Sequence, residues 1–211
     1  MARRLGERAN VVALGPGLTA DDERTRGFVR AFVEQRATPL VIDADGLNAL
    51  APWPGELRGT VERPLVLTPH VGEMRRLLGR DEKDALADRV QAAREFATAQ
   101  SLILVLKGAR TIIAAPDGRV AVNPTGNAGL GTAGAGDTLT GLITGCLAQA
   151  YGALREKADA FETVVAAVYL GGLAGDIAAR ERGMRTLVAS DIREHFGAAV
   201  RTLDAAGEQP R

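Results

Sequence analysis

The segment that decides the fold class is residues 102–122, which read LILVLKGARTIIAAPDGRVAV. Its first five residues are apolar without polar alternation, as expected of a strand that is buried on both faces of a parallel sheet. The rest contains two shorter apolar runs, residues 112–115 and 120–122, around Pro-Asp-Gly, which is the pattern of a β-hairpin. The segment therefore predicts a mixed sheet with an antiparallel hairpin at its edge.

The chain before this segment alternates between strand and helix patterns. Three more apolar runs without polar alternation lie at residues 11–14, 40–42 and 65–67. Stretches with apolar residues on one helical face lie between the runs, at residues 21–35, 72–78 and 84–100. Because strands that alternate with helices form right-handed βαβ units, the sequence predicts a three-layer α/β domain whose central sheet is mostly parallel.

The chain after the hairpin is mostly helical. Helices are predicted at residues 137–151, 159–182 and 190–203, the last with Ser190 as its N-cap. No linker or repeat interrupts the 211 residues, so we expect one domain over residues 1–211.

Composition excludes several classes of protein. The 26 basic residues balance the 26 acidic ones, which argues against a protein that binds nucleic acid or anionic lipid. The only cysteine, Cys146, cannot form an internal disulfide, so we expect a reducing cytoplasm. The uncharged stretch at residues 163–175 is shorter than the ~18 residues that a transmembrane helix needs. It is expected to lie in the core of its own domain or, alternatively, against a second subunit.

Polar residues follow each of the four predicted parallel strands, at the sheet edge where α/β proteins bind ligands. These segments are Gly15-Pro-Gly17, Asp43-Ala-Asp-Gly-Leu-Asn48, Thr68-Pro-His-Val-Gly-Glu73 and Lys107-Gly108. Each has a simpler explanation when taken alone. Gly-Pro-Gly is typical of a tight turn, Asp45 of a helix cap, and His70 of an ordinary loop.

The glycine-rich segment 123–137 reads NPTGNAGLGTAGAGD and leads into a predicted helix. Free backbone N–H groups at a helix N-terminus bind anions, so we predict an anion hole at Gly134, Ala135 and Gly136. A carboxylate there suits a general base, which would be Asp137. The alternative is a flexible loop with Asp137 as the N-cap. The segment is neither a dinucleotide fingerprint, because no strand precedes it directly, nor a Walker A loop, because it lacks Lys-Ser or Lys-Thr.

Together these motifs resemble the ribokinase-like fold in its ADP-dependent NAD(P)H-hydrate dehydratase branch. The resemblance covers residues 11–183 and includes Lys107-Gly108-Ala-Arg-Thr111 together with the segments quoted above. It implies an enzyme that phosphorylates the S form of hydrated NADH or NADPH from ADP and then eliminates phosphate, which restores the reduced nicotinamide and leaves AMP.

The resemblance also implies roles for individual residues. Asp137 would be the catalytic base facing the hydrate, with Gly17, His70 and Asn48 contacting the same substrate. Glu73 would support Mg²⁺. The remaining matches would bind ADP or AMP, and they are Lys107, Gly108, Ala109, Arg110, Thr111 and Gly136.

Members of the family usually begin with a further strand and helix that line the dinucleotide pocket, and this sequence is N-terminally short of them, which predicts an exposed sheet edge. Two other functions use the same anion hole: a small-molecule kinase of the ribokinase-like superfamily, and a non-catalytic nucleotide-binding protein. We expect small-molecule ligands, no nucleic-acid or membrane partner, and a cytoplasmic homo-oligomer, for which a tetramer is one candidate state.

Overall fold

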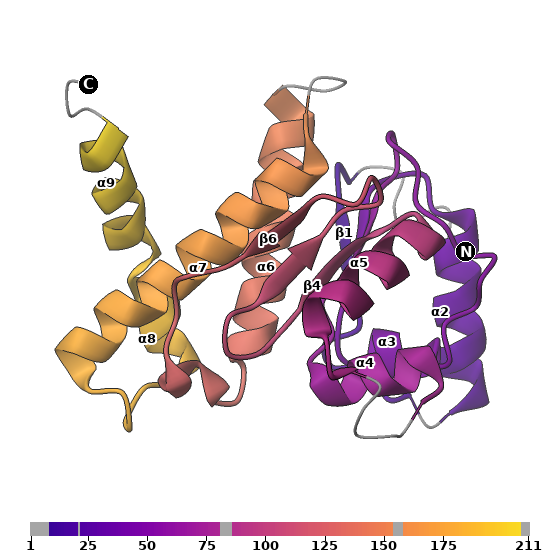
Figure 1. Ribbon diagram of the computed structural model, residues 1–211, viewed down its shortest axis with the longest axis horizontal. Helices are drawn as coiled ribbons and strands as arrows, with labels where there is room; N and C mark the ends of the chain where they lie inside the picture. The colour runs from indigo at the N-terminus through magenta and orange to yellow at the C-terminus, as the bar shows by residue number, and fades with distance from the viewer. Residues whose placement is uncertain (1–8, 21, 81–85, 154–157, 208–211) are drawn as a thin grey trace.

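A six-stranded mixed sheet forms the centre of the protein (Figure 1). The computed structural model describes residues 9–20, 22–80, 86–153 and 158–207. The first four strands pair in parallel and the last two continue the sheet antiparallel, in the chain order β1-β2-β3-β4-β5-β6. The strands are β1 (Val12–Leu14), β2 (Leu40–Ile42), β3 (Leu65–Leu67), β4 (Ile103–Leu106), β5 (Ile112–Ala114) and β6 (Val120–Val122). The predicted mixed sheet with its hairpin edge is confirmed.

Helices cover both faces of the sheet. One face carries α2 (Glu23–Gln35), α3 (Asp45–Ala49), α4 (Val71–Leu78) and α5 (Arg89–Gln100), and the other carries α6 (Ala135–Ala153) and α7 (Ala160–Arg182). Successive strand residues point to opposite faces, so Leu40 and Ile42 join the first core whereas Val41 joins the second. Burial on both faces explains why these strands are continuously apolar in sequence.

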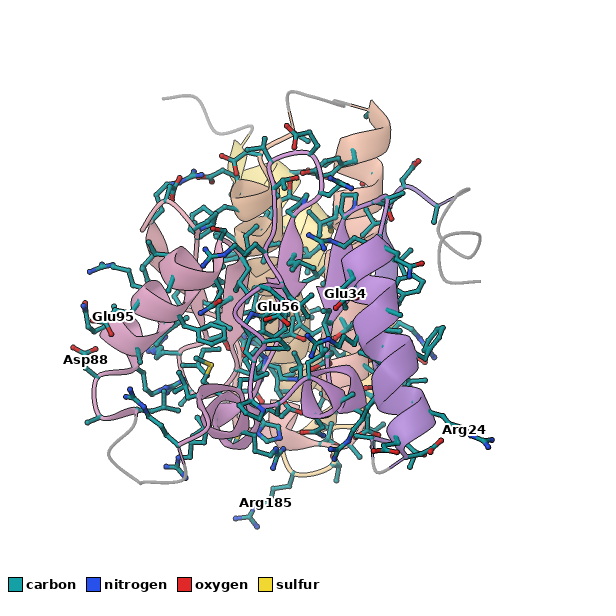
Figure 2. All side chains as sticks on the ribbon, turned by 90° about the vertical axis from the view of Figure 1, so that its right-hand side faces the viewer. Arg24, Glu34, Glu56, Asp88, Glu95 and Arg185 are labelled. Atoms are coloured by element: carbon teal, nitrogen blue, oxygen red, sulfur yellow. The ribbon has the colours of Figure 1, made fainter. Side chains whose placement is uncertain are left out.

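The surface of this layered core is charged. Arg24, Asp88, Glu95 and Arg185 lie at the periphery and point away from the molecule (Figure 2). The interior is built mainly from aliphatic side chains, consistent with an aromatic content of only 4%.

The C-terminal part differs from the predicted single helix at residues 190–203. The chain forms two helices, α8 (Ala189–Glu194) and α9 (Phe196–Gly207), which pack on α7 away from the sheet (Figure 1). The prediction of Ser190 as the N-cap is also wrong, because Ser190 lies inside α8, and Asp191 accepts the hydrogen bond from the Val188 N–H instead (3.0 Å). The break falls at His195, whose ring nitrogens contact the Asp191 carbonyl and the Glu181 carboxylate.

The start of α5 also lies later than predicted. Residues 84–85 are outside the described residues, and the helix begins at Arg89 because the Asp88 carboxylate caps it by accepting the Gln91 N–H (2.9 Å).

The uncharged stretch at residues 163–175 lies within helix α7. By length and composition α7 is long enough to cross a membrane, so the length argument made from residues 163–175 does not hold for the whole helix. Its apolar residues nevertheless pack inside this domain, against α6, the sheet and α9. Nine of them are buried: Phe161, Val164, Ala167, Val168, Gly171, Gly172, Ala174, Gly175 and Ala178. Packing within this chain therefore accounts for the buried side of this stretch.

Candidate functional site

The turns that follow β1 and β2 meet at the carboxyl edge of the sheet. Gly15 has a φ of +132°, and a Cβ added there would lie 1.8 Å from the Asp43 carbonyl oxygen. No side chain fits at this position. Glycine is therefore required for the first turn to pack against the second, which brings the end of β1 next to Asp43.

The centre of the site is a buried ion pair between Asp43, after β2, and Lys107, at the end of β4. The Lys107 Nζ donates to Asp43 Oδ1 (2.7 Å), and the Thr140 hydroxyl of α6 donates to Asp43 Oδ2 (2.6 Å). Asp43 is only 1% exposed. Burial alone would raise the pKa of this carboxyl, but the Lys107 ammonium and the two hydrogen bonds outweigh it and hold the pKa below its usual value.

The N-terminus of α6 lies directly against this ion pair. A Cβ added at Gly136 would be 3.5 Å from Lys107 Nζ and 3.8 Å from Asp43 Oδ2. The helix begins at Ala135, after Gly134 in a left-handed conformation (φ +80°). A helix N-terminus and an ammonium group thus lie side by side, and both favour an anion. The two residues that the sequence predicted to bind nucleotide phosphate, Lys107 and Gly136, are brought together.

Asp137 lies in the first turn of α6 and is exposed. The alternative that Asp137 is the N-cap is wrong, because the helix already begins two residues earlier. Its carboxylate makes no hydrogen bond to any described residue, so it is available to a ligand. The position beside the anion site is the one that a general base for a substrate hydroxyl requires.

His70 and Glu73 form the N-terminal cap of α4, next to Lys107. The Nδ1 atom of His70 accepts the N–H groups of Gly72 (2.9 Å) and Glu73 (3.2 Å), so Nδ1 carries no proton in this arrangement. The Glu73 carboxylate accepts the His70 N–H (2.7 Å) in return. The imidazole is 54% exposed, and its Nε2 lies 3.5 Å from Glu73 Oε1.

Glu73 is the residue predicted to support a metal ion. Its Oε2 lies 3.9 Å from Lys107 Nζ, so Lys107 sits between the carboxylates of Glu73 and Asp43. The described residues contain no group of three or more His, Cys, Asp or Glu side chains that could hold a metal. Asp43 is not available to a metal, because both of its oxygens accept hydrogen bonds, from Lys107 and Thr140. The single carboxylate of Glu73 still fits the way Mg²⁺ is commonly bound, by one or two carboxylates together with substrate phosphates and water.

The loop after β4 contains the other predicted nucleotide-binding residues. Gly108 has a φ of +151°, and Arg89 supports the loop by donating to the Ala109 carbonyl (3.2 Å). The Arg110 guanidinium donates to the Pro124 carbonyl (2.7 Å), and the Thr111 hydroxyl donates to the Gly108 carbonyl (3.3 Å). The loop is thus tied to α5 on one side and to the glycine-rich segment on the other.

Gly17 and Asn48 form no hydrogen bond with Asp43 or Lys107. Gly17 has a φ of +78° and open space where a side chain would be. The Asn48 amide donates to Asp45 (3.1 Å) and accepts from Arg76 (3.0 Å), so it joins α3 to α4 and contacts neither Asp43 nor Lys107. The interpretation of Asp45 as a helix cap is wrong, since Asp45 is inside α3 and the N-cap position is Ala44.

A cleft of about 600 Å³ extends from Asp137 along the outer face of α6. Gly141 and Gly145 line it on α6, and Arg193 and Phe196 line it from the α8–α9 junction. Its volume lies in the range of small-molecule sites. Sequence reasoning missed Arg193, Phe196, Thr140 and Arg89, because only the folded chain brings them next to the predicted residues. Asp43 was in a segment that the sequence singled out, but no role was assigned to it.

Comparison with known families agrees with this geometry. A profile described as NAD(P)H-hydrate dehydratase matches residues 2–196. The chain belongs to the NAD(P)H-hydrate dehydratase family. The resemblance inferred from the motifs is thereby confirmed.

Two relatives illustrate the similarity. The bifunctional NAD(P)H-hydrate repair enzyme of Moorella thermoacetica is 44% identical over 204 residues, which are 97% of this chain and 37% of that protein. The ADP-dependent (S)-NAD(P)H-hydrate dehydratase of Bacillus subtilis is 34% identical over 194 residues, or 90% of this chain and 64% of that protein. The chain therefore spans between about a third and two thirds of the length of these relatives.

Solved structures of the family share the fold. The ADP/ATP-dependent NAD(P)H-hydrate dehydratase of Bacillus subtilis, co-crystallised with ATP and Mg²⁺ and soaked with coenzyme A, superposes with a TM-score of 0.77 at 31% identity. That match covers 95% of this chain and 71% of the other. A hydroxyethylthiazole kinase from Pyrococcus horikoshii, at 16% identity and a TM-score of 0.65, shares the fold alone. The predicted ribokinase-like α/β fold is confirmed.

Proposed function

We propose that this family member catalyses the ADP-dependent dehydration of the S forms of hydrated NADH and NADPH, with AMP and phosphate as the other products. The observation that carries the proposal is the Lys107 ammonium, fixed by Asp43 beside Gly136 at the start of α6. This arrangement suits the terminal phosphate of ADP. Asp137 is the residue that follows Gly136 in α6. The activity named for the Bacillus relative agrees with that chemistry.

The proposed reaction has two steps. Asp137 accepts the proton of the added hydroxyl, whose oxygen attacks the β-phosphorus of ADP, and the bond to the bridging oxygen breaks so that AMP leaves. The carbon–oxygen bond of the phosphorylated hydrate then breaks, phosphate leaves with the electron pair, and loss of a proton from the neighbouring carbon restores the ring double bond. Lys107 and the N–H group of Gly136 stabilise the negative charge on the transferring phosphoryl group, whereas the Ala135 N–H, predicted to share this role, donates to the Thr132 carbonyl (3.3 Å).

Several finer properties belong to this proposal. Mg²⁺ would be held by the nucleotide phosphates together with Glu73, and when bound it would neutralise part of the phosphate charge. His70, Gly17 and Asn48 would contact the hydrated dinucleotide. The protein would act in the cytoplasm as a homo-oligomer, with a tetramer as one candidate state, and would bind neither nucleic acid nor membrane.

The test is a turnover assay on the purified chain. Hydrated NADH in its S form is mixed with Mg²⁺ and either ADP or ATP, and the absorbance of reduced nicotinamide is followed while free phosphate is measured. Recovery of absorbance with release of phosphate is the expected result. A phosphorylated hydrate without free phosphate would instead identify a small-molecule kinase, and ADP binding without either product would identify a non-catalytic nucleotide-binding protein.

The role of Asp137 is tested in the same assay. Asp137→Asn removes the base but retains the size of the side chain, so turnover should fall about 10²- to 10⁴-fold while ADP binding is retained. Asp159→Asn is the matched control, because Asp159 also lies at the start of a helix but caps α7 away from the site. Loss of ADP binding together with activity would show that Asp137 builds the site rather than reacting in it.

A further inference from the structure

The glycine-rich segment is held to α7 by one acidic side chain, Asp176. The Asp176 Oδ2 accepts the backbone N–H of Gly126 (2.9 Å), and its Oδ1 accepts the side-chain amide of Asn127 (2.9 Å). The same amide nitrogen of Asn127 also donates to the Gly175 carbonyl (3.0 Å). Asp176 forms no salt bridge with any described residue, so its charge is directed to the loop alone.

Hydrogen bonds continue from this contact to the start of α6. The Asn127 Oδ1 accepts the Gly129 N–H (2.9 Å) and so caps the short 3₁₀-helix η2 (Ala128–Gly131). The Thr132 N–H donates to the Gly129 carbonyl (3.3 Å), and the Ala135 N–H donates to the Thr132 carbonyl (3.3 Å). A continuous series of hydrogen bonds therefore connects Asn127, the partner of Asp176, to Ala135 at the start of α6.

Close packing holds the loop at the same place. The Thr125 hydroxyl donates to the Tyr169 carbonyl of α7 (2.9 Å), and a Cβ at Gly172 would lie 2.2 Å from that hydroxyl. A Cβ at Gly175 would lie 2.5 Å from Leu130 of η2. Without side chains at these two glycines, the loop approaches α7 closely enough for Asp176 to reach it.

We propose that Asp176 is a positioning residue, which holds the glycine-rich segment so that the N-terminus of α6 at Gly136 stays beside Lys107. The inference rests on the proposed function for its catalytic consequence, but the effect on ADP binding does not depend on turnover. Two carboxylate oxygens are needed because two N–H groups converge on Asp176. An asparagine there has one acceptor oxygen and turns an NH₂ group toward a second donor.

The experiment compares Asp176→Asn with wild type by calorimetric titration of ADP, by steady-state kinetics, and by amide hydrogen exchange. We expect the Kd for ADP to rise about tenfold, because one converging donor loses its partner. Exchange should speed up at Gly126 and continue through Gly129 to Ala135. Increased exchange confined to Gly126, with an unchanged Kd, would overturn the proposal.

A double-mutant cycle with Asn127→Ala tests whether the two residues act as a unit. If they do, the double variant binds ADP no more weakly than the poorer single variant. Effects on Kd that multiply would show that the two side chains act independently and would contradict the proposal. Asn127→Ala by itself also keeps the test valid if Asp176→Asn does not fold.

Asp159→Asn is again the matched control, being the same substitution on the same helix at a position that contacts Arg119 and not the glycine-rich segment. Asp159→Asn should leave the Kd for ADP unchanged. A rise in Kd as large as that of Asp176→Asn would show that any weakening of α7 has this effect, and it would overturn the specific role of Asp176. If wild type binds ADP but does not dehydrate the hydrate, the proposed function fails while the Kd and exchange measurements still decide the role of Asp176.

Discussion

Two ionic clusters tie the sheet to helices, and they differ mainly in their contact with water. At the carboxyl edge, Lys107 and Asp43 pair with side chains that are 20% and 1% exposed. At the hairpin, Arg119 contacts Asp117, Asp159 and Glu162, and all four side chains are at least 44% exposed. The second cluster has more contacts, but the first is much less exposed to water.

The difference shows why the number of ion pairs in a cluster is a poor guide to its contribution to stability. An exposed pair exchanges one set of polar partners for another, so it contributes little to stability. A buried pair has already lost its hydration, and removing one partner leaves a costly isolated charge. The buried pair also lies beside the N-terminus of α6, where the sequence predicts that an anion binds.

The largest effect is expected from Asp43→Ala. Its removal leaves the Thr140 hydroxyl without a partner and the Lys107 ammonium with only the more distant Glu73 carboxylate (3.9 Å), and the free energy of unfolding should fall by about 3 kcal/mol. Urea denaturation followed by circular dichroism measures the change. Asp117→Ala, which removes a carboxylate from the exposed cluster, is the control, and equal losses in the two variants would contradict the comparison.

Lowering the pH should gradually remove the stabilisation that the ionised Asp43 carboxylate provides. The pKa of Asp43 is lowered in the folded protein, so its stabilisation is complete above the ordinary pKa of ~3.9 and is lost as the pH falls through the lower folded-state value. The stability of wild type relative to Asp43→Asn should therefore shrink only below about pH 4. A difference that already declines near neutral pH would assign the effect to another group.

His195 provides a case between the two clusters, with a ring that is 10% exposed and a partner, Glu181, that is 60% exposed. Its hydrogen bond to Glu181 and its bond to the Asp191 carbonyl raise the pKa of the ring, although Arg182 opposes this. The stabilisation is thus complete below the ordinary pKa of ~6.5 and is lost as the pH rises through the folded-state value.

The corresponding variant is His195→Gln, which should lose about 1 kcal/mol at pH values below that range and less above it. Chemical denaturation of both proteins over a series of pH values measures this. A loss that is independent of pH would mean that the ring acts only by packing at the α8–α9 junction.

The smallest effect is expected from Arg119→Ala. Its exposed ion pairs and its stacking over the Phe161 ring, at 4.7 Å from the centroid, together should contribute about 0.5–1 kcal/mol. The ionic part should decrease in concentrated salt, where screening acts within a few ångströms. Thermal denaturation at low and high salt tests this, and a salt-independent loss would assign the effect to stacking alone.

Several elements were predictable from local sequence because their cause is local. The strands at residues 40–42 and 65–67 are continuous apolar runs, and the structure has them with the same bounds. The hairpin was indicated by Pro116-Asp117-Gly118, and the Asp117 carboxylate does accept the Arg119 N–H within the turn (3.0 Å). The existence of α6 followed from the change of glycine-rich sequence to a helical pattern, although the helix begins at Ala135, two residues before the predicted start.

Other features depend on residues that are far apart in the chain. The sequence 43–48 contains two aspartates, and nothing local distinguishes Asp43, which pairs with a lysine 64 positions later, from Asp45, which does not. The division into α8 and α9 likewise depends on His195 reaching Glu181, 14 residues earlier on another helix.

The sequence by itself determined the α/β class, the mixed sheet and the family, and it predicted the residue types of an anion site, since these follow from short-range periodicity and from motifs of adjacent residues. Only the tertiary structure decided which carboxylate holds Lys107, that Arg89 and Asp176 support the two loops of the site, and that Arg193 and Phe196 reach the cleft beside Asp137. The physical reason is that hydrogen bonds and desolvation act between neighbours in space, and the packing of the layers, rather than the order of the chain, determines those neighbours.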